Sequence, residues 1–96
     1  MGETAIYLHA GTTYAWDRDK AAANIAHHQL AFEEAVEAFA DPYLVMADAS
    51  QHGQQRWKAL GYGSHGLLTV IHAETDGDSI RIVSALAGHL AGKEFL

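Results

Sequence analysis

The sequence of 96 residues is long enough for one domain, and its 49% hydrophobic content is enough for one hydrophobic core. The chain contains no cysteine, which excludes disulfides, thiolate catalysis and zinc sites built from cysteine. Its formal net charge of −6 argues against broad, non-specific binding of nucleic acid, but that charge is compatible with a small local basic site.

No membrane or targeting segment is expected. No apolar run approaches the roughly 20 residues that a membrane-spanning helix needs. The first residues also lack the basic start of a signal peptide. We therefore expect a soluble, cytoplasmic protein.

The chain begins with a short strand-like piece at residues 4–8. We interpret residues 1–13 as an N-terminal extension that precedes a single domain at residues 14–96. A short strand is expected at residues 14–16. Asp17 is a good N-cap residue, so a first helix is expected to begin after it and to run to about His28.

A second helix is expected over residues 32–40. Its apolar residues recur at helical spacing, and three glutamates fill the opposite face. Pro42 follows directly, and proline cannot continue a helical hydrogen-bond pattern. The two helices should therefore end before this proline.

After Pro42 the apolar pattern changes to a period of two, which is typical of strands. Strands are expected at residues 43–47, 55–62, 66–73 and 78–85, with hairpin turns at residues 63–66 and 74–77. Residues 86–96 are expected to form a short C-terminal helix. The predicted fold class is α+β, with two N-terminal helices packed on a mainly antiparallel sheet of about four strands.

The expected strand at residues 66–73 is apolar on both faces, as at the centre of a sheet. Strand alternation places Arg56 and Lys58 on one face of a flanking strand, and it places Arg81 opposite Ile82 on the other flanking strand. Basic side chains beside an apolar floor are suited to binding a phosphate. Charged residues that decorate the wet side of a sheet are an equally good interpretation.

The other polar residues each admit two interpretations. The seven histidines lack the spacing of a metal site, so no metal site is expected. Glu33, in the first turn of the second expected helix, is either a general base or part of a solvated helix face. Lys20 either contacts a phosphate or pairs with Asp17 across one helical turn.

A set of residues and short segments runs in order along residues 14–85: Trp16-Asp17-x-x-Lys20, Asn24, His28, Phe32-Glu33-Glu34-Ala35, Phe39, Asp41-Pro42, Arg56, Gly61 and Ile80-Arg81-Ile82-Val83-Ser84-Ala85. This set resembles the BrnT toxin family. The resemblance implies a RelE-like fold and a ribonuclease toxin of a type II toxin–antitoxin pair. It also implies neutralisation by a ribbon-helix-helix, BrnA-like antitoxin, which binds DNA, so that the toxin meets DNA only through its partner.

The substrate that the resemblance implies is RNA, cleaved without a metal or other cofactor so that translation and growth are inhibited. The ribose 2′-hydroxyl would attack the phosphate while basic side chains stabilise the developing charge. The expected catalytic residues are Arg56, Arg81, Glu33 and His28, and the expected substrate-binding residues are Lys20 and Lys58.

The chain departs from the family pattern in two places. The segment at residues 27–31 lacks the usual glycine turn and serine cap, and a strongly basic helix after Ala85 is reduced to Lys93. An alternative function is therefore a catalytically inactive relative that still binds the antitoxin. A growth-arrest assay separates the two hypotheses.

Overall fold

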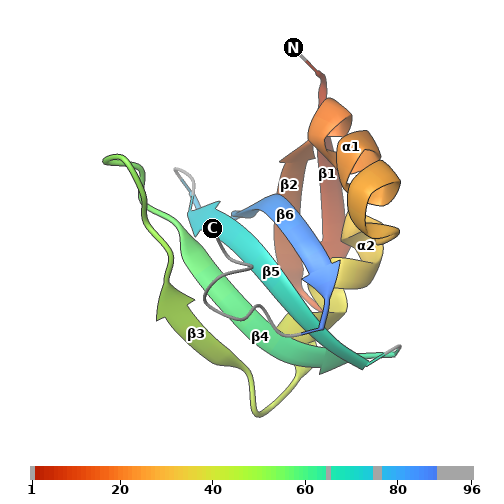
Figure 1. The fold of residues 1–96 in the computed structure, drawn as a ribbon, viewed down its shortest axis with the longest axis vertical. Coiled ribbons are helices and arrows are strands. Elements are labelled where there is room, and N and C mark those ends of the chain that lie inside the picture. Colours follow the sequence, from red (N-terminus) through yellow and green to blue (C-terminus); the bar gives the residue numbers. More distant parts are fainter. Residues whose placement is uncertain (1, 65, 75–76, 89–96) are drawn as a thin grey trace.

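In the part of the chain that the computed structural model describes, residues 2–64, 66–74 and 77–88, six strands form one mixed sheet (Figure 1). The strand order is β1-β2-β6-β5-β4-β3, and all neighbours are antiparallel except the parallel pair β2 and β6. None of the described helices is long and apolar enough to cross a membrane. The elements in chain order are β1 (Thr4–His9), β2 (Thr12–Asp17), α1 (Arg18–His28), α2 (Phe32–Ala35), the 3-10 helix η1 (Val36–Ala40), β3 (Val45–Asp48), β4 (Trp57–Gly63), β5 (Gly66–Glu74) and β6 (Ile80–Ala87).

The expectation of two N-terminal helices on a sheet of about four strands is wrong, because the fold is dominated by its six-stranded sheet. Part of the difference comes from the first residues of the chain. β1 and β2 form a hairpin around Ala10 and Gly11, whose φ angles of 52° and 81° match a tight two-residue turn. This hairpin joins the sheet where Tyr14 and Ala15 pair with the start of β6.

The second expected helix is shorter than predicted. α2 has four residues, and the chain then continues as the 3-10 helix η1. η1 packs closely on β4, since a Cβ atom at Gly61 would overlap the carbonyl oxygen of Ala38. The expected C-terminal helix is wrong at its start, because β6 extends to Ala87, and its residues 89–96 lie outside the described part of the chain.

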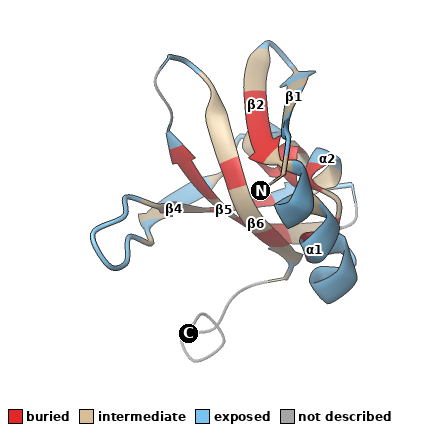
Figure 2. Ribbon diagram, turned by 90° about the horizontal axis from the view of Figure 1, so that it is seen from above, coloured by how far each residue is buried: buried red, intermediate tan, exposed pale blue. Residues whose placement is uncertain are grey.

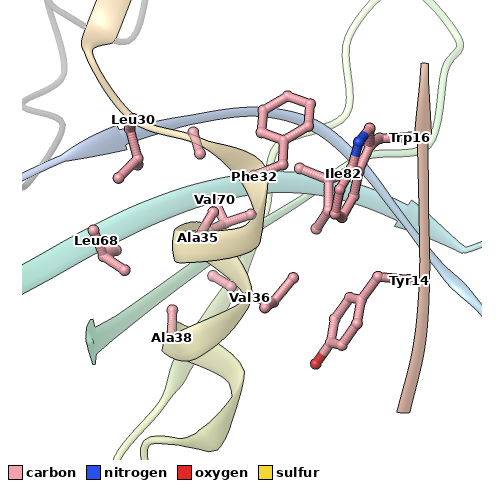
Figure 3. Close-up of a cluster of buried hydrophobic side chains, with 12 residues drawn as sticks. Tyr14, Trp16, Leu30, Phe32, Ala35, Val36, Ala38, Leu68, Val70 and Ile82 are labelled. Carbon is pink, nitrogen blue, oxygen red and sulfur yellow. The ribbon is translucent and has the colours of Figure 1, made fainter. Parts of the chain in front are cut away.

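The core lies between one face of the sheet and the segment formed by α2 and η1 (Figure 3). Phe32 and Val36 are fully buried there, beside Val70 of β5 and Ile82 of β6. The Trp16 ring meets the Phe32 ring edge-on, with centroids 5.6 Å apart. Figure 2 shows that the buried residues concentrate on the central strands and α2, while much of α1 and the loop before β4 are exposed. The opposite face of the central strands is therefore not covered by α2 or η1.

One side chain fixes α1 beside the sheet. β2 pairs with β6 only at Ile80 and Arg81, so beyond these residues the edge of β6 has no strand partner on that side among the described residues. Asn24 of α1, 5% exposed, fills this place: its Oδ1 accepts a hydrogen bond from the Ala85 N–H at 3.0 Å, and its Nδ2 donates to the Ala85 carbonyl at 2.8 Å. The same Nδ2 donates to the Leu30 carbonyl at 2.9 Å. The amide thus replaces a missing strand and also holds the turn that follows α1.

His72 lies on the core face of β5 and is 2% exposed. Its ring meets Phe39 edge-on with centroids 5.0 Å apart, and neither ring nitrogen has a hydrogen-bond partner among the described residues. Burial lowers the pKa of His72 from 6.5 to about 4. The ring is therefore neutral at pH 7.

We expect His72 to make the stability of the protein depend on pH. Because its pKa is lower in the folded than in the unfolded state, the unfolded state binds the proton first, and stability falls as the pH drops from 6.5 toward 4. Between pH 7 and pH 5 this group should lower the free energy of unfolding by about 2 kcal/mol. Denaturant unfolding at both pH values measures the change. His72→Leu should remove it and His27→Ala, on the exposed surface of α1, should keep it; equal pH dependence in wild type and His72→Leu contradicts the assignment.

A second prediction concerns Asn24. Asn24→Leu keeps the branched shape of the side chain but leaves the N–H and C=O of Ala85 and the carbonyl of Leu30 without their partner, so the free energy of unfolding should fall by about 3 kcal/mol or more. The matched control is Ile25→Ala, because Ile25 is 51% exposed on the same helix. Chemical denaturation of the two variants checks this, and a loss for Asn24→Leu no larger than that of the control would show that the amide is dispensable.

Candidate functional site

A groove opens on the sheet face opposite the core. Its floor comes from Ile71 of β5 and from Val83, Ser84 and Leu86 of β6. Ile71 pairs with Ser84 of β6 and with Lys58 of β4. Residues paired directly across strands point to the same face of a sheet, so Ile71, Ser84 and Lys58 share the face on which the groove lies. The volume is about 490 Å³, which is within the range of small-ligand sites.

The first wall of the groove is the end of α1, where His28 lines it. α1 begins as predicted, since the Asp17 Oδ1 accepts hydrogen bonds from the N–H groups of Asp19 at 2.7 Å and Lys20 at 3.2 Å. It ends at Gln29, whose φ of 55° is left-handed. The helix therefore stops just after His28 and leaves this exposed side chain at the rim of the groove.

The second wall is the connection between β3 and β4. His52 and Gly53, with φ angles of 52° and 78°, form its tip, and Gln51 and Gln54 exchange two backbone hydrogen bonds across it. Ala49, Gln51, His52, Gln54 and Arg56 from this connection line the groove. Most of these side chains are polar, and the base of the connection is joined across by the Ala49 N–H, which donates to the Arg56 carbonyl at 2.9 Å.

Arg56 is the cation of this wall. Its Nη1 donates to the Gln55 carbonyl at 2.9 Å, and its Nη2 donates to the Gln54 Oε1 at 3.1 Å. The Ser50 hydroxyl accepts a hydrogen bond from the Arg56 N–H at 3.0 Å, which fixes the backbone at the base of the connection. Because both guanidinium contacts are to neutral oxygens, they orient the group without neutralising its charge.

A second hollow of about 220 Å³ adjoins the groove, because His28, Val83 and Ser84 line both. Lys20 and His27 line this second hollow. His28 therefore lies between the two hollows, with Arg56 in one and Lys20 in the other. Of the predicted site residues, these three are brought around one stretch of β6.

Lys58 and Arg81 lie on the same sheet face but outside the lining of these hollows. Lys58 pairs in register with Ile71 of the floor, and its side chain has an interaction partner. Arg81 pairs with Ala73, the residue after His72, while Trp57 pairs with His72. Arg56 directly precedes Trp57, the first residue of β4. Arg56 and Arg81 therefore lie at nearly the same position along β5, on opposite sides of it, and their backbones are about 10 Å apart.

Glu33 is separated from this constellation. It is exposed in the first turn of α2, which packs on the core face of the sheet. The neighbouring Glu34 has a clear local role, since its Oε1 accepts a hydrogen bond from the N–H of the N-cap residue Ala31 at 3.0 Å, which is the glutamate half of a capping box. The structure thus does not bring Glu33 together with Arg56 and His28.

Sequence reasoning missed Ser84 because strand alternation fails in β6. Ile71 pairs with Ser84 but His72 pairs with Ile82, so Val83 is an extra residue in a bulge. Simple alternation from Arg81 would place Ser84 toward the core; the bulge turns it into the groove floor. Asn24 was noted only as part of a motif, and no local signal shows that its partner is Ala85, 61 residues later.

No three side chains of histidine, aspartate or glutamate cluster as metal ligands within the described ranges. Residues 16–87 match the family model described as "Ribonuclease toxin, BrnT, of type II toxin-antitoxin system". No curated protein matches the chain. The family match spans α1, the β3–β4 connection, β5 and β6, which together contribute every residue that lines the groove. This chain belongs to the BrnT family of ribonuclease toxins of type II toxin–antitoxin systems.

Proposed function

We propose that this protein cleaves RNA in the groove without a metal ion and thereby inhibits translation and growth. The observation that carries the proposal is the convergence of His28, Arg56 and Lys20 around Val83 and Ser84. A histidine can transfer a proton and a guanidinium can bind phosphate oxygens, so the groove combines the two groups that phosphodiester cleavage requires.

The reaction that fits these groups is an internal transesterification. The ribose 2′-hydroxyl attacks the adjacent phosphorus, and the bond from phosphorus to the 5′-oxygen of the next nucleotide breaks. The products are a 2′,3′-cyclic phosphate and a 5′-hydroxyl, so no water or external nucleophile enters this step. A general base accepts the 2′-hydroxyl proton, and the departing 5′-oxygen takes up a proton.

His28 is our choice for the base. It lines the groove that also holds Arg56, whereas Glu33 lies on α2. An imidazole can also accept and return a proton, as a general base must. Glu33 is therefore the less suitable of the two residues that the family resemblance offered.

Arg56 and Arg81 are assigned to the scissile phosphate, and Lys20 and Lys58 to the flanking phosphates. A planar guanidinium offers two parallel N–H donors to the developing negative charge, and it stays protonated at every relevant pH. Arg56 is already oriented by its bonds to Gln54 and Gln55. Orientation before the substrate binds is what makes such donors effective in the transition state.

The partner implied by the family is a protein antitoxin. We propose that it is of the ribbon-helix-helix type, that it covers the sheet face carrying Arg56 and Arg81, and that both proteins act in the cytoplasm. Covering this face would exclude RNA from the groove, which gives a direct route to neutralisation.

The test is cleavage of a single-stranded RNA in the presence of EDTA. Arg56→Lys, Arg81→Lys and His28→Ala should each lower the rate roughly 10²–10³-fold, because lysine keeps the charge but lacks the planar pair of N–H donors of arginine, and alanine cannot transfer a proton. Arg18→Lys is the matched control, because Arg18 pairs with Glu3 in an exposed salt bridge of 3.8 Å at the start of α1. Glu33→Gln should stay close to wild type.

Wild-type cleavage that tolerates both arginine changes would remove the groove from the mechanism. A large loss of cleavage rate in Glu33→Gln with none in His28→Ala would show that Glu33, and not His28, is the general base. If the wild type cleaves no RNA and arrests no growth, the chain is the inactive antitoxin-binding relative instead.

A further inference from the structure

A second concave surface lies on the same sheet face, farther along β4. We call it the tyrosine hollow; it is lined by Asp41, Tyr43, Val45, Leu60, Tyr62 and Leu67, and its volume is about 610 Å³. Three of these residues are largely exposed although they are apolar or aromatic: Tyr43 at 85%, Tyr62 at 65% and Val45 at 59%. Large apolar side chains gathered at one exposed site mark an interaction surface.

The two tyrosines are held in place by one carboxylate. The Asp41 Oδ1 accepts a hydrogen bond from the Tyr43 N–H at 2.8 Å, and the Asp41 Oδ2 accepts one from the Tyr62 N–H at 2.8 Å. These bonds, first that from Tyr43, lower the pKa of Asp41, so the carboxylate is ionised at neutral pH. The hollow is therefore preorganised, with backbone positions that need not become ordered when a partner binds.

The hollow and the groove are connected along β4. Lys58, Leu60 and Tyr62 alternate onto the same face: Lys58 pairs with the groove residue Ile71, and Tyr62 pairs with Leu67 of the hollow. From Lys58 to Tyr62 the distance along the strand is about 13 Å. An extended segment a few residues long can therefore reach from the hollow to the rim of the groove.

The charge of the hollow identifies the class of its ligand. Its charged residue is Asp41, and the nearby Glu37 accepts a hydrogen bond from the Ser64 N–H at 2.7 Å, so carboxylates border the apolar surface. Phosphates of RNA are repelled by such a border, whereas a protein segment with an apolar anchor and a neighbouring lysine or arginine is attracted. Tyrosines around an apolar pocket are also typical of the residues that dominate protein–protein affinity.

We propose that the tyrosine hollow is the anchoring site for the antitoxin. One apolar side chain of the antitoxin fills the space between Tyr43 and Tyr62, a basic residue beside it faces Asp41, and the chain continues along β4 to cover the groove. The inference rests on the proposed function in that the groove is what the antitoxin must close. The inference differs from the proposed function in placing most of the free energy of antitoxin binding outside the groove.

The experiment measures the dissociation constant of the complex with the protein encoded by the adjacent reading frame of the operon. Tyr62→Ala and Tyr43→Ala should each weaken binding at least about 30-fold, as expected for anchor residues. Asp41→Asn should weaken it more at low salt than at high salt. Ile6→Ala is the matched control, because Ile6 is 68% exposed on β1 at the opposite edge of the sheet. Thermal melts confirm that each variant is folded.

Affinities within about twofold of wild type in both tyrosine variants would overturn the proposal, as would the absence of binding by the wild type. RNA binding is measured in parallel with a 2′-O-methyl oligonucleotide, which cannot be cleaved. If Tyr62→Ala weakens RNA binding but not antitoxin binding, the hollow is a base-stacking site and the proposal is wrong. Loss of antitoxin binding in a protein that cleaves no RNA would support the anchor while rejecting the catalytic assignment, so the two failures are distinguishable.

Discussion

The hydrogen bonds of Asn24 to the edge of β6 fix α1 beside the sheet and so place one wall of the candidate groove. Where β2 stops pairing with β6, a helical side chain takes over both backbone groups of Ala85. α1 is thereby kept beside β6, and its last residue, His28, lines the groove from its rim. A further strand paired with this edge of β6 would satisfy the same backbone groups of Ala85, but it would place no histidine beside the groove. A buried amide with three satisfied hydrogen bonds thus links the fold directly to the site.

The positive charge of the groove is local, so a net negative charge on the whole chain is compatible with RNA binding in the groove. The formal net charge is −6, yet Arg56 meets neutral oxygens and Lys20 lies in the adjoining hollow. Potential near a phosphate depends on the nearest charges more than on the total, because salt screens distant ones beyond about 10 Å. The carboxylate of Asp41 then gives the far end of the same face the opposite sign. One sheet face can in this way offer separate places to an RNA phosphate and to a basic protein segment.

Local patterns predicted the parts of the molecule that local physics controls. The cap at Asp17, the end of α1 near His28 and the alternation that puts Trp57 and Ala59 on one face of β4 and Lys58 on the other follow from propensity and strand period. The six-stranded sheet did not follow, because the hairpin of β1 and β2 joins the sheet only through the pairing of β2 with a distant partner, the start of β6. The bulge at Val83 is likewise a tertiary feature, and it puts Ser84 on the opposite face from the one that simple alternation from Arg81 would give. A long second helix was predicted from the apolar periodicity. In the structure α2 gives way to the 3-10 helix η1, which packs closely on β4.

The central claim is that the groove between the end of α1 and the β3–β4 connection receives RNA. A titration of the isotope-labelled protein with a 2′-O-methyl oligoribonucleotide, followed by backbone amide chemical shifts, tests this most directly. The account predicts saturable shifts at Ile71, Ser84 and Leu86 and in the residues around Arg56, with little change at Tyr43. Shifts confined to other surfaces, or none at concentrations at which the RNA binds, would contradict it.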